Sequence, residues 1–449
     1  MRLALALALG CAILPARPAH AQPRPMDPGS SASRPIEAEP PYIDLLTFGV
    51  GERIFEKFGH AALCLRYHDP NLMPVCFNFG VTDFAEGPGM IWSFLRSEQK
   101  FWVEPSTYGE MYGFYRWEDR DIWLQTLPVT GVQARALEAK LWASLEEANR
   151  YYYYDHFFDN CTTRLRDLID EATNGALAVG GDEPYPATFR DLGYRGVAEL
   201  PPLIVISDFV MGRQLDQYPT VWQAMFHPDI FRQQIERRLG VAPELLYRRV
   251  GGKLPGEGAN GRLAMLAISI LFALPLLLAR SRGRGSKVAI HVAYWSVLAF
   301  VLQGSLPLLW EAVGAYALIV PVLAITVFAL AHGKRGERIA LGWAAFHVGF
   351  WGLLVWSLVA ISSIVGVRWN EAVFVVVPFD LILPFLGEAR RRRYAQVRVA
   401  MVVLASLLCA IGILHQPLWI PILAVFLPMS ILAFDLPHGI VARFTRQPG

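Results

Sequence analysis

Residues 151–170 read YYYYDHFFDNCTTRLRDLID and contain the cysteine around which the chain is organised. Asp159 and Asn160 are good N-cap residues, and apolar residues follow them at helical spacing, so a helix is expected to begin close to Cys161. The positive end of a helix and its free N–H groups favour thiolate over thiol. The pattern therefore predicts a nucleophilic cysteine, with a buried structural cysteine as the alternative.

The composition is too apolar for a purely soluble protein, since 54% of the residues are hydrophobic and the mean hydropathy is +0.32. Apolar runs long enough to cross a bilayer begin only after about residue 260. We expect seven membrane spans, at about 263–279, 288–306, 312–331, 339–361, 373–386, 397–414 and 418–436. The net charge of +2 gives no indication of a nucleic-acid partner.

The start of the chain has the features of a secretory signal peptide. Residues 1–21 contain an early arginine, an apolar run and a small-x-small cleavage site at Ala19-His20-Ala21. Residues 22–41 are rich in Pro, Ser and Ala without periodicity, as in a flexible leader. We therefore expect an exported domain over 42–256 and a transmembrane helical domain over 257–449.

The basic residues between the apolar runs indicate the orientation of the spans. They fall on one side once the exported domain is placed outside, at 280–287, 334–338, 390–393 and 443–446. Seven crossings that start outside end inside, so the C-terminus is expected in the cytoplasm. Asp380 within the fifth span is expected either to face a cavity or partner or to lie near the membrane interface.

Export exposes the cysteines of the domain to an oxidising compartment. Cys64 and Cys76 flank the turn-rich stretch 68–74 symmetrically, as opposed positions on a hairpin would. They can therefore pair with each other and leave Cys161 as a free thiol, which in an exported domain is a sign of reactivity.

The domain has an α+β order. Strand-like runs cover 43–50, 60–67, 75–79 and 122–127. An amphipathic helix is expected over 132–153 and leads to the cysteine. For the tyrosines at 151–154 we favour packing against the strands over a platform that faces lipid or substrate.

A cysteine nucleophile needs a base within hydrogen-bonding reach, and the base needs a partner that orients it. His60 opens a strand directly after Phe58-Gly59, and His156 lies just before the cysteine. A glycine before a histidine suggests a close backbone approach, as beside a substrate cleft. The alternative for a single strand histidine is a hydrogen-bonded core residue.

Three stretches resemble the N-terminal periplasmic domain of Lnb, a bacterial lipoprotein N-acyltransferase family. They are FGHAALCLR at 58–66, FNFGVTDF at 77–84 and FDNCTTRLRDLID at 158–170. That domain is similar to circularly permuted papain-like folds such as the lecithin:retinol acyltransferase group. The resemblance implies an α+β permuted papain-like domain in front of an all-α polytopic membrane domain. It assigns Cys161 as the nucleophile, His60 as the base and Asn78 as the residue that orients the imidazole.

The resemblance also implies the reaction. Cys161 would take a fatty acyl chain from a phospholipid as a thioester and pass it to the α-amine of a lipoprotein N-terminal diacylglyceryl cysteine. The oxyanion would be met by the backbone N–H of Cys161 and the Asn160 amide. Thr162, Thr163 and Arg164 would line the mouth of the site, whereas Arg166 is expected in an ion pair with Asp167 or Asp170. The location would be the bacterial inner membrane, with the catalytic domain in the periplasm.

Two other classes of function are considered. A phospholipase or a peptidoglycan hydrolase would use the same Cys and His chemistry. A membrane sensor or transporter would use the exported domain only to bind a ligand, although the spans hold few paired charges. No cofactor is expected, because the sequence has no metal-ligand spacing, phosphate-binding loop or nucleotide fingerprint.

Overall fold

The computed structural model describes residues 39–52, 56–83, 93, 96–197, 207–251, 273, 276–277, 333–361 and 364–436. The expected signal peptide and almost all of the leader lie outside these residues, as do the first three expected spans apart from residues 273, 276 and 277. The described residues form two compact units. The N-terminal domain contains those of Ala12–Glu199 and Gln217–Glu257, and the C-terminal unit contains those of Leu200–Asp216 and Gly258–Gly449. The segment Leu200–Asp216, expected in the exported domain, thus belongs to the C-terminal unit.

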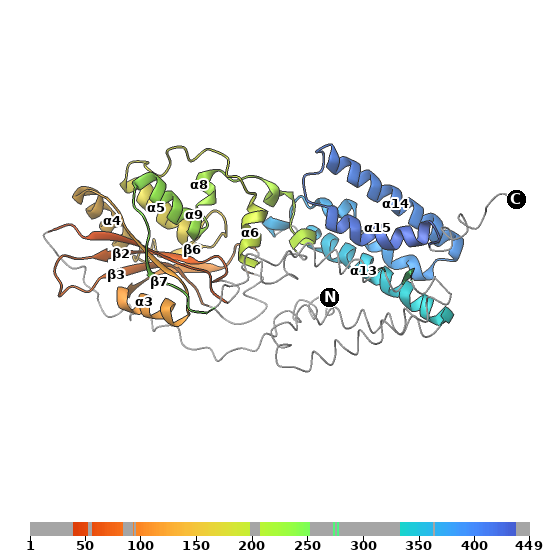
Figure 1. The fold of residues 1–449 in the computed structure, drawn as a ribbon, viewed down its shortest axis with the longest axis horizontal. Helices are drawn as coiled ribbons and strands as arrows, with labels where there is room; N and C mark the ends of the chain where they lie inside the picture. The colour runs from red at the N-terminus through yellow and green to blue at the C-terminus, as the bar shows by residue number, and fades with distance from the viewer. Residues whose placement is uncertain are drawn as a thin grey trace. The chain divides into compact units, whose positions relative to one another are not determined.

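The N-terminal domain is built on one antiparallel seven-stranded sheet with the strand order β6-β4-β3-β2-β1-β5-β7 (Figure 1). The strands are β1 (Tyr42–Phe48), β2 (His60–Arg66), β3 (Val75–Val81), β4 (Lys100–Thr107), β5 (Ile122–Thr126), β6 (Tyr151–Tyr153) and β7 (Glu244–Tyr247). The four expected strands correspond to β1, β2, β3 and β5. The central strands β1 and β2 are buried on both faces, as in a sheet that is covered on both sides.

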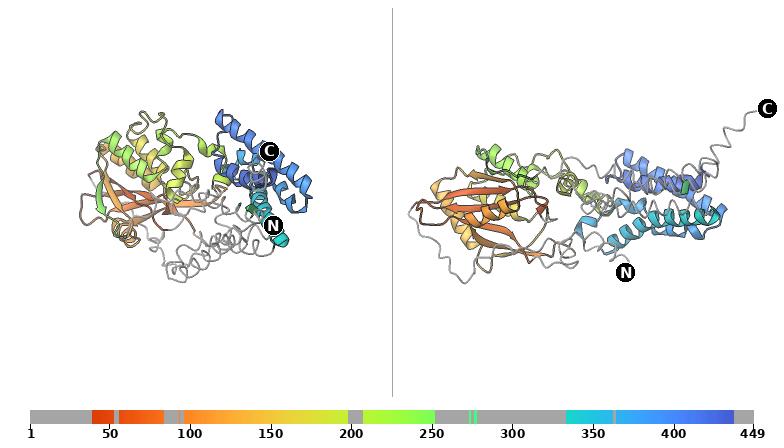
Figure 2. Two further views of the ribbon diagram at one scale, coloured as in Figure 1. Left: turned by 45° about the vertical axis from the view of Figure 1, so that its right-hand side comes forward. Right: turned by 60° about the horizontal axis from the view of Figure 1, so that its bottom comes forward.

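Helices cover both faces of this sheet (Figures 1 and 2). Helix α3 (Tyr108–Trp117) lies on one face, where Met111 and Tyr115 join a buried cluster with Phe48, Ala62 and Cys64. The opposite face carries α4 (Gly131–Ala143), α5 (Cys161–Ala172) and α9 (Pro228–Leu239). Shorter helices of the domain are α6 (Phe189–Val197) and α8 (Val221–Ala224). The first residue of β2, His60, thus lies at the end of a strand between two helical layers.

The helix predicted over 132–153 is too long. Helix α4 ends at Ala143, and Tyr151–Tyr153 form the edge strand β6, which pairs with Lys100–Trp102 of β4. Tyrosine favours strands over helices, and the open edge of β4 supplies the partner that the local sequence does not reveal. The structure therefore supports the interpretation in which these tyrosines pack against the strands.

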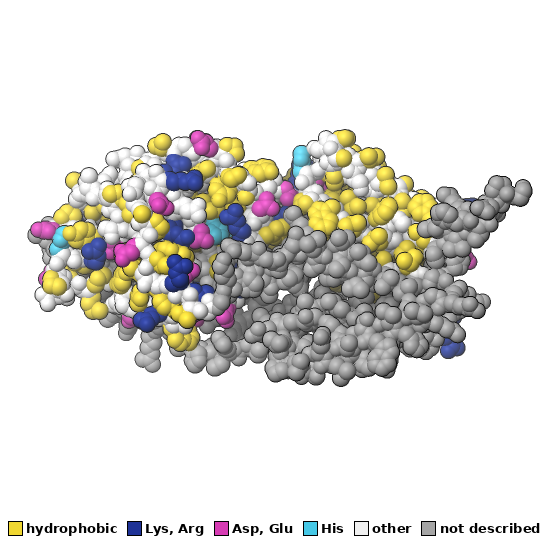
Figure 3. Space-filling view, viewed as in Figure 1, with side chains coloured by type: hydrophobic (Ala, Val, Ile, Leu, Met, Phe, Trp, Pro, Cys, Tyr) yellow, Lys and Arg dark blue, Asp and Glu magenta, His cyan; other side chains and the backbone are white. Residues whose placement is uncertain are grey.

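The C-terminal unit is helical. Its main elements are η2 (Arg213–Asp216), α13 (Gly333–Ile361), η3 (Val365–Val367), η4 (Glu371–Phe374), η5 (Pro378–Phe385), α14 (Glu388–Ala410) and α15 (Trp419–Ala433). Two of the described helices are long and apolar enough to cross a membrane, over Arg335–Ile361 and Glu388–Ala410, and α15 is a shorter apolar helix. Figure 3 shows apolar side chains gathered on the visible face of this unit, whereas charged side chains are scattered over the N-terminal domain.

The span expected at 373–386 is not a continuous α-helix. It consists of the 3₁₀-helices η4 and η5, since Pro378 and Pro384 lack the N–H donors that an α-helical ladder needs. Two glycines of α13 let this segment approach closely. A Cβ atom on Gly349 would lie 2.4 Å from the Leu381 side chain, and one on Gly352 would lie 2.2 Å from the carbonyl carbon of Val377. Gly352, the later of the two glycines, meets Val377, and Gly349 meets Leu381, which comes after Val377 in the sequence. The segment therefore runs antiparallel to α13.

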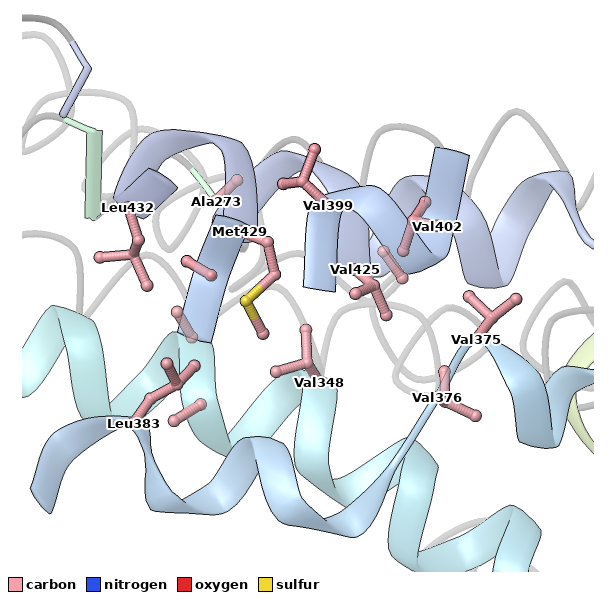
Figure 4. Packing of buried hydrophobic residues seen from close by; sticks show 14 of the residues in the cluster. Ala273, Val348, Val375, Val376, Leu383, Val399, Val402, Val425, Met429 and Leu432 are labelled. Carbon is pink, nitrogen blue, oxygen red and sulfur yellow. The ribbon is translucent and has the colours of Figure 1, made fainter. Parts of the chain in front are cut away.

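A buried ion pair joins η5 to α14. Arg398 donates from Nε and from one terminal nitrogen to the two Asp380 carboxylate oxygens over 2.8 and 2.9 Å, and Tyr394 donates to the same carboxylate. Both charged side chains are buried. Asp380 was expected either to face a cavity or partner or to lie near the membrane interface. The structure shows that it has a partner within the protein, Arg398. Valines and leucines of α13, α14, α15 and the 3₁₀ segment form one apolar cluster in the same unit (Figure 4).

Candidate active site

Cys161 is the first residue of α5, as expected, and its N-cap is Asn160. The Asn160 side-chain oxygen accepts hydrogen bonds from the backbone N–H groups of Thr162 and Thr163, each over 2.9 Å. The Thr163 hydroxyl in turn accepts from the Asn160 backbone N–H. This reciprocal cap fixes the first turn of the helix and with it the position of the thiol.

Cys161 is a free cysteine, because Cys64 and Cys76 form a disulfide. These two residues are direct partners in the β2–β3 ladder and are fully buried. The pairing that the sequence allowed is therefore present. It leaves Cys161 as the free thiol of the described part of the N-terminal domain.

The protonation of Cys161 differs from the expectation for a helix start. Burial raises the pKa of the thiol, although the Thr162 hydroxyl 3.6 Å away and the backbone N–H groups of Ala61, Thr162 and Cys161 act in the opposite direction. Desolvation outweighs the helix end because the side chain is largely buried. The group is therefore a neutral thiol at neutral pH, and its reaction requires a base.

His60 and Asn78 are brought together at the splayed ends of β2 and β3. The His60 Nε2 atom lies 2.9 Å from the Asn78 side-chain oxygen, and the Gly80 backbone N–H donates to the same oxygen over 2.9 Å. Since an N–H of Gly80 can only donate, the Asn78 atom is an acceptor, and His60 Nε2 must carry the proton. This tautomer leaves the lone pair on Nδ1, which is the form of histidine that acts as a base.

The backbone around His60 is adapted to its position. Gly59 has a φ of +83°, and a Cβ there would lie 2.6 Å from the Phe48 carbonyl oxygen. A Cβ on Gly80 would lie 2.6 Å from His60 Cε1. Gly80 sits in an irregularity of the β3–β4 pairing between Asn78 and Val81, as β-bulges beside active sites often do.

The surroundings of His60 keep the imidazole neutral. Burial and the charge of Arg120 lower its pKa to about 4, against the opposing effect of the Asn78 hydrogen bond. The ring lies beside the stacked pair of Phe48 and Tyr115 of α3, and its centroid is 6.1 Å from that of Phe48 and 6.0 Å from that of Tyr115. A base that is unprotonated at neutral pH can accept the proton of a neutral thiol.

His60 and Cys161 approach each other from different layers. The register places His60 and Asn78 on the face covered by α3, whereas α5 packs on the opposite face. Both layers meet at the end of β2, where the backbone N–H of Ala61, the residue after His60, interacts with the Cys161 sulfur. Within the described residues the sulfur makes no hydrogen bond to His60. A backbone N–H lies about 2.4 Å from the preceding Cα, so the imidazole is attached close to the sulfur.

Most of the polar residues expected to bind substrate form hydrogen bonds or ion pairs within the protein. The Asn160 amide donates to the carbonyl oxygens of His156 and Phe226, so it has no hydrogen left for an oxyanion, and that expectation is corrected. Thr162 and Thr163 are buried in the cap. Arg164 forms a two-pronged ion pair with Asp159, over 2.7 and 2.8 Å.

Arg166, in contrast, pairs as expected with Asp167. It also donates to the Trp222 carbonyl oxygen and is itself buried, whereas Asp167 is exposed, so the pair is solvated only on the side of the carboxylate.

Sequence reasoning missed two residues next to His60. Tyr115 belongs to an aromatic and glycine-rich stretch that was not recognised as a helix, and Arg120 follows that helix. The Thr107 and Glu110 side chains form a capping box at the start of α3, and this pattern could have revealed the helix.

A model of the family described as the Lnb N-terminal periplasmic domain matches residues 34–194. Residues 34–194 are an Lnb periplasmic domain. The match includes His60, Asn78 and Cys161. No curated protein and no solved structure matches the chain, so the likeness of the Lnb domain to permuted papain-like folds remains a prediction.

The Lnb domain is completed by residues that follow the matched region. Phe226 accepts a hydrogen bond from the Asn160 cap, and the Trp222 carbonyl oxygen holds Arg166. Strand β7 pairs with β5 and forms one edge of the sheet. With the two membrane-length helices of the C-terminal unit, the chain is a membrane protein with a periplasmic N-terminal domain.

Proposed function

We propose that this protein is a thiol-dependent N-acyltransferase of the bacterial inner membrane. It would move a fatty acyl chain from a phospholipid through a thioester on Cys161 to the α-amine of a lipoprotein N-terminal diacylglyceryl cysteine. The observation that carries the proposal is a free thiol at a capped helix start, beside a His60–Asn78 pair of defined tautomer, in an Lnb domain.

In the first half of the reaction, His60 Nδ1 takes the proton of the Cys161 thiol as the sulfur attacks the ester carbonyl of the phospholipid. A carbon–sulfur bond forms, and the carbonyl electron pair moves to oxygen. When this intermediate collapses, the ester carbon–oxygen bond breaks, and the imidazolium returns the proton to the leaving alcohol. The products are the acyl thioester and a lysophospholipid.

In the second half, the lipoprotein amine attacks the thioester carbonyl. A terminal amine with a pKa near 8 has a usable neutral fraction at neutral pH, and His60 removes its second proton during attack. The carbon–sulfur bond then breaks, and the proton goes to the sulfur. The low pKa of His60 suits both halves, because the imidazole starts each of them unprotonated.

Both substrates are anchored in a bilayer, so a catalytic domain joined to membrane helices searches only the membrane surface. The orientation proposed is that of the positive-inside rule. Arg392 at the start of α14 donates to the carbonyl oxygen of Ala433 at the end of α15, so these two helix ends lie together. The arginines at 390–393 would mark this end as cytoplasmic.

The proposal is tested on a reporter lipoprotein expressed with and without this protein. The wild-type chain should add one acyl chain to the N-terminal peptide, detected by mass spectrometry, and Cys161→Ala should leave the amine free. Cys409→Ala is the matched control, because Cys409 is the other free cysteine described and lies in α14. If lysophospholipid accumulates without the added chain, the enzyme is a phospholipase. An added chain in the Cys161→Ala strain would refute the thiol mechanism.

A further inference from the structure

The proposed reaction needs hydrogen-bond donors for the oxygen that becomes negative when Cys161 attacks. The backbone N–H of Cys161 is one donor, since it lies in the first turn of α5 and interacts with its own sulfur. The Asn160 amide is not a second donor, because His156 and Phe226 accept both of its hydrogens. A single donor leaves the oxyanion only partly stabilised.

Tyr115 is a candidate for the second donor, because its ring lies beside that of the base His60. It belongs to the last turn of α3 and is buried, with its ring stacked 3.6 Å from that of Phe48 and 6.0 Å from that of His60. An electrostatic interaction links it to Cys161. Its hydroxyl makes no hydrogen bond to any residue in the described part of the chain.

The ring of Tyr115 is held in place by Arg120. The guanidinium carbon lies 4.6 Å from the ring centroid, and Nε donates to the Gly49 carbonyl oxygen over 2.8 Å. Arg120 is buried, and among the described residues one of its terminal nitrogens has no hydrogen-bond partner. The cation over the ring thus fixes Tyr115 and adds positive potential beside His60.

Tyr152 provides a contrast among the tyrosines near the thiol. It too interacts electrostatically with Cys161, but its hydroxyl donates to the Phe79 carbonyl oxygen. That hydroxyl hydrogen is already used within the protein. The Tyr115 hydroxyl differs because it keeps its hydrogen for a ligand.

We propose that the Tyr115 hydroxyl donates the second hydrogen bond to the substrate carbonyl oxygen during formation and breakdown of the Cys161 thioester. This inference rests on the proposed acyltransferase function and adds a catalytic residue to it. As the carbon–sulfur bond forms, the carbonyl electron pair moves to oxygen, and Tyr115 donates to that oxygen without losing its proton. The proton of the thiol goes to His60 and from there to the leaving group.

The test compares two reactions of the same thiol in the purified full-length protein in detergent micelles. Acylation by p-nitrophenyl octanoate passes through an oxyanion and is followed by the burst of p-nitrophenolate. Alkylation by iodoacetamide is a direct displacement without an oxyanion. Tyr115→Phe, which removes only the hydroxyl, should slow acylation of Cys161 about 100-fold. The rate of alkylation should stay within about twofold of the wild type, as expected for unchanged thiol reactivity.

Tyr112→Phe is the matched control, because Tyr112 lies on the same helix one turn before the site and should leave both rates unchanged. Equal slowing of both reactions in Tyr115→Phe would show a merely structural role and overturn the inference, as would an unchanged acylation rate. In either case, wild-type acylation of Cys161 leaves the acyltransferase proposal intact. A wild-type protein that is alkylated but never acylated at Cys161 would overturn both proposals.

Discussion

Two buried arginines show how differently the two regions of this protein treat a buried charge. In the C-terminal unit, Arg398 meets the Asp380 carboxylate through two hydrogen bonds and also donates to the Val375 carbonyl oxygen. In the N-terminal domain, Arg120 stacks on Tyr115, and one of its terminal nitrogens has no partner among the described residues. Unpaired buried polar atoms are costly, so each one needs an explanation such as a catalytic role or a bound ligand.

The difference suggests that the buried charges of the two regions have different roles, in packing and in chemistry. The C-terminal unit uses its buried charges to join η5 to α14, a role in packing. The N-terminal domain gathers the Tyr115 hydroxyl, for which the described residues offer no hydrogen-bond partner, and an unpaired Arg120 nitrogen beside the neutral His60. Perturbations of the first region should therefore change stability, and those of the second should change chemistry.

The largest effect on chemistry is expected from His60→Gln. Without the base, the rate of Cys161 acylation should fall by 10²- to 10⁴-fold, whereas the unfolding temperature should change little because glutamine is also neutral. The measurement is the p-nitrophenolate burst together with thermal unfolding. His68→Gln is the control, since His68 lies just beyond the other end of β2 and donates to the Pro40 carbonyl oxygen. A normal burst in His60→Gln would remove His60 from the mechanism.

The largest effect on stability is expected from Arg398→Met. It leaves the Asp380 carboxylate buried without its countercharge, which typically costs about 3–5 kcal/mol. Arg120→Met should cost less, because Arg120 faces no carboxylate in the described structure. Detergent-micelle unfolding measures both variants. The double variant Asp380→Leu with Arg398→Met should recover most of the loss, and a failure to recover would show that the pair does more than balance charge.

Loss of the disulfide should affect the N-terminal domain alone. Replacing Cys64 and Cys76 by alanine is expected to lower the free energy of unfolding by roughly 2–4 kcal/mol. Because the β2–β3 ladder has only three residue pairs, around this bond, the His60–Asn78 hydrogen bond should weaken as well. Domain unfolding followed by tryptophan fluorescence, with Cys409→Ala as control, tests the stability. An unchanged midpoint would mean that the ladder holds without the bond.

The pH dependence of stability should report the buried imidazole. The folded pKa of His60 is about 4, below the usual 6.5, so the unfolded chain binds more protons between these values. The stability that His60 contributes is complete above pH 6.5 and should be lost as the pH falls toward 4, by on the order of 3 kcal/mol. Unfolding of His60→Gln should show a flatter profile in this window. His156, whose pKa is also about 4, leaves a residual slope in that variant.

The smallest effect is expected from Gly80→Ala. The new methyl group would lie 2.6 Å from His60 Cε1, so the imidazole must shift by a few tenths of an ångström or more. Acylation should slow about tenfold, since small misplacements of a catalytic group are costly. Gly113→Ala on α3 is the control, because no atom lies within 4 Å of its added methyl group. A slowed control or an unaffected Gly80→Ala would contradict the close packing around the base.

The sequence predicted the features that depend on local patterns. The N-cap at Asn160, the strand that begins at His60 and the pairing of Cys64 with Cys76 follow from spacing and residue type. Features that depend on distant partners were missed. Tyr151 begins an edge strand because β4 offers it a partner, and the raised thiol pKa of Cys161 arises from enclosure by residues far along the chain.

Strand β7 has a consequence for the order in which the protein matures. The Asp119 carboxylate accepts hydrogen bonds from Tyr247, Val250 and Gly251. These bonds connect the end of the N-terminal domain to the turn before β5. During synthesis, the domain can therefore close its sheet before the membrane helices emerge from the ribosome. The segment Leu200–Asp216 must wait longer, because Asn370 and Gln416 hold it through the carbonyl oxygens of residues 208–210. Maturation thus ends with the docking of a short helical segment whose partner Asn370 is translated some 160 residues later.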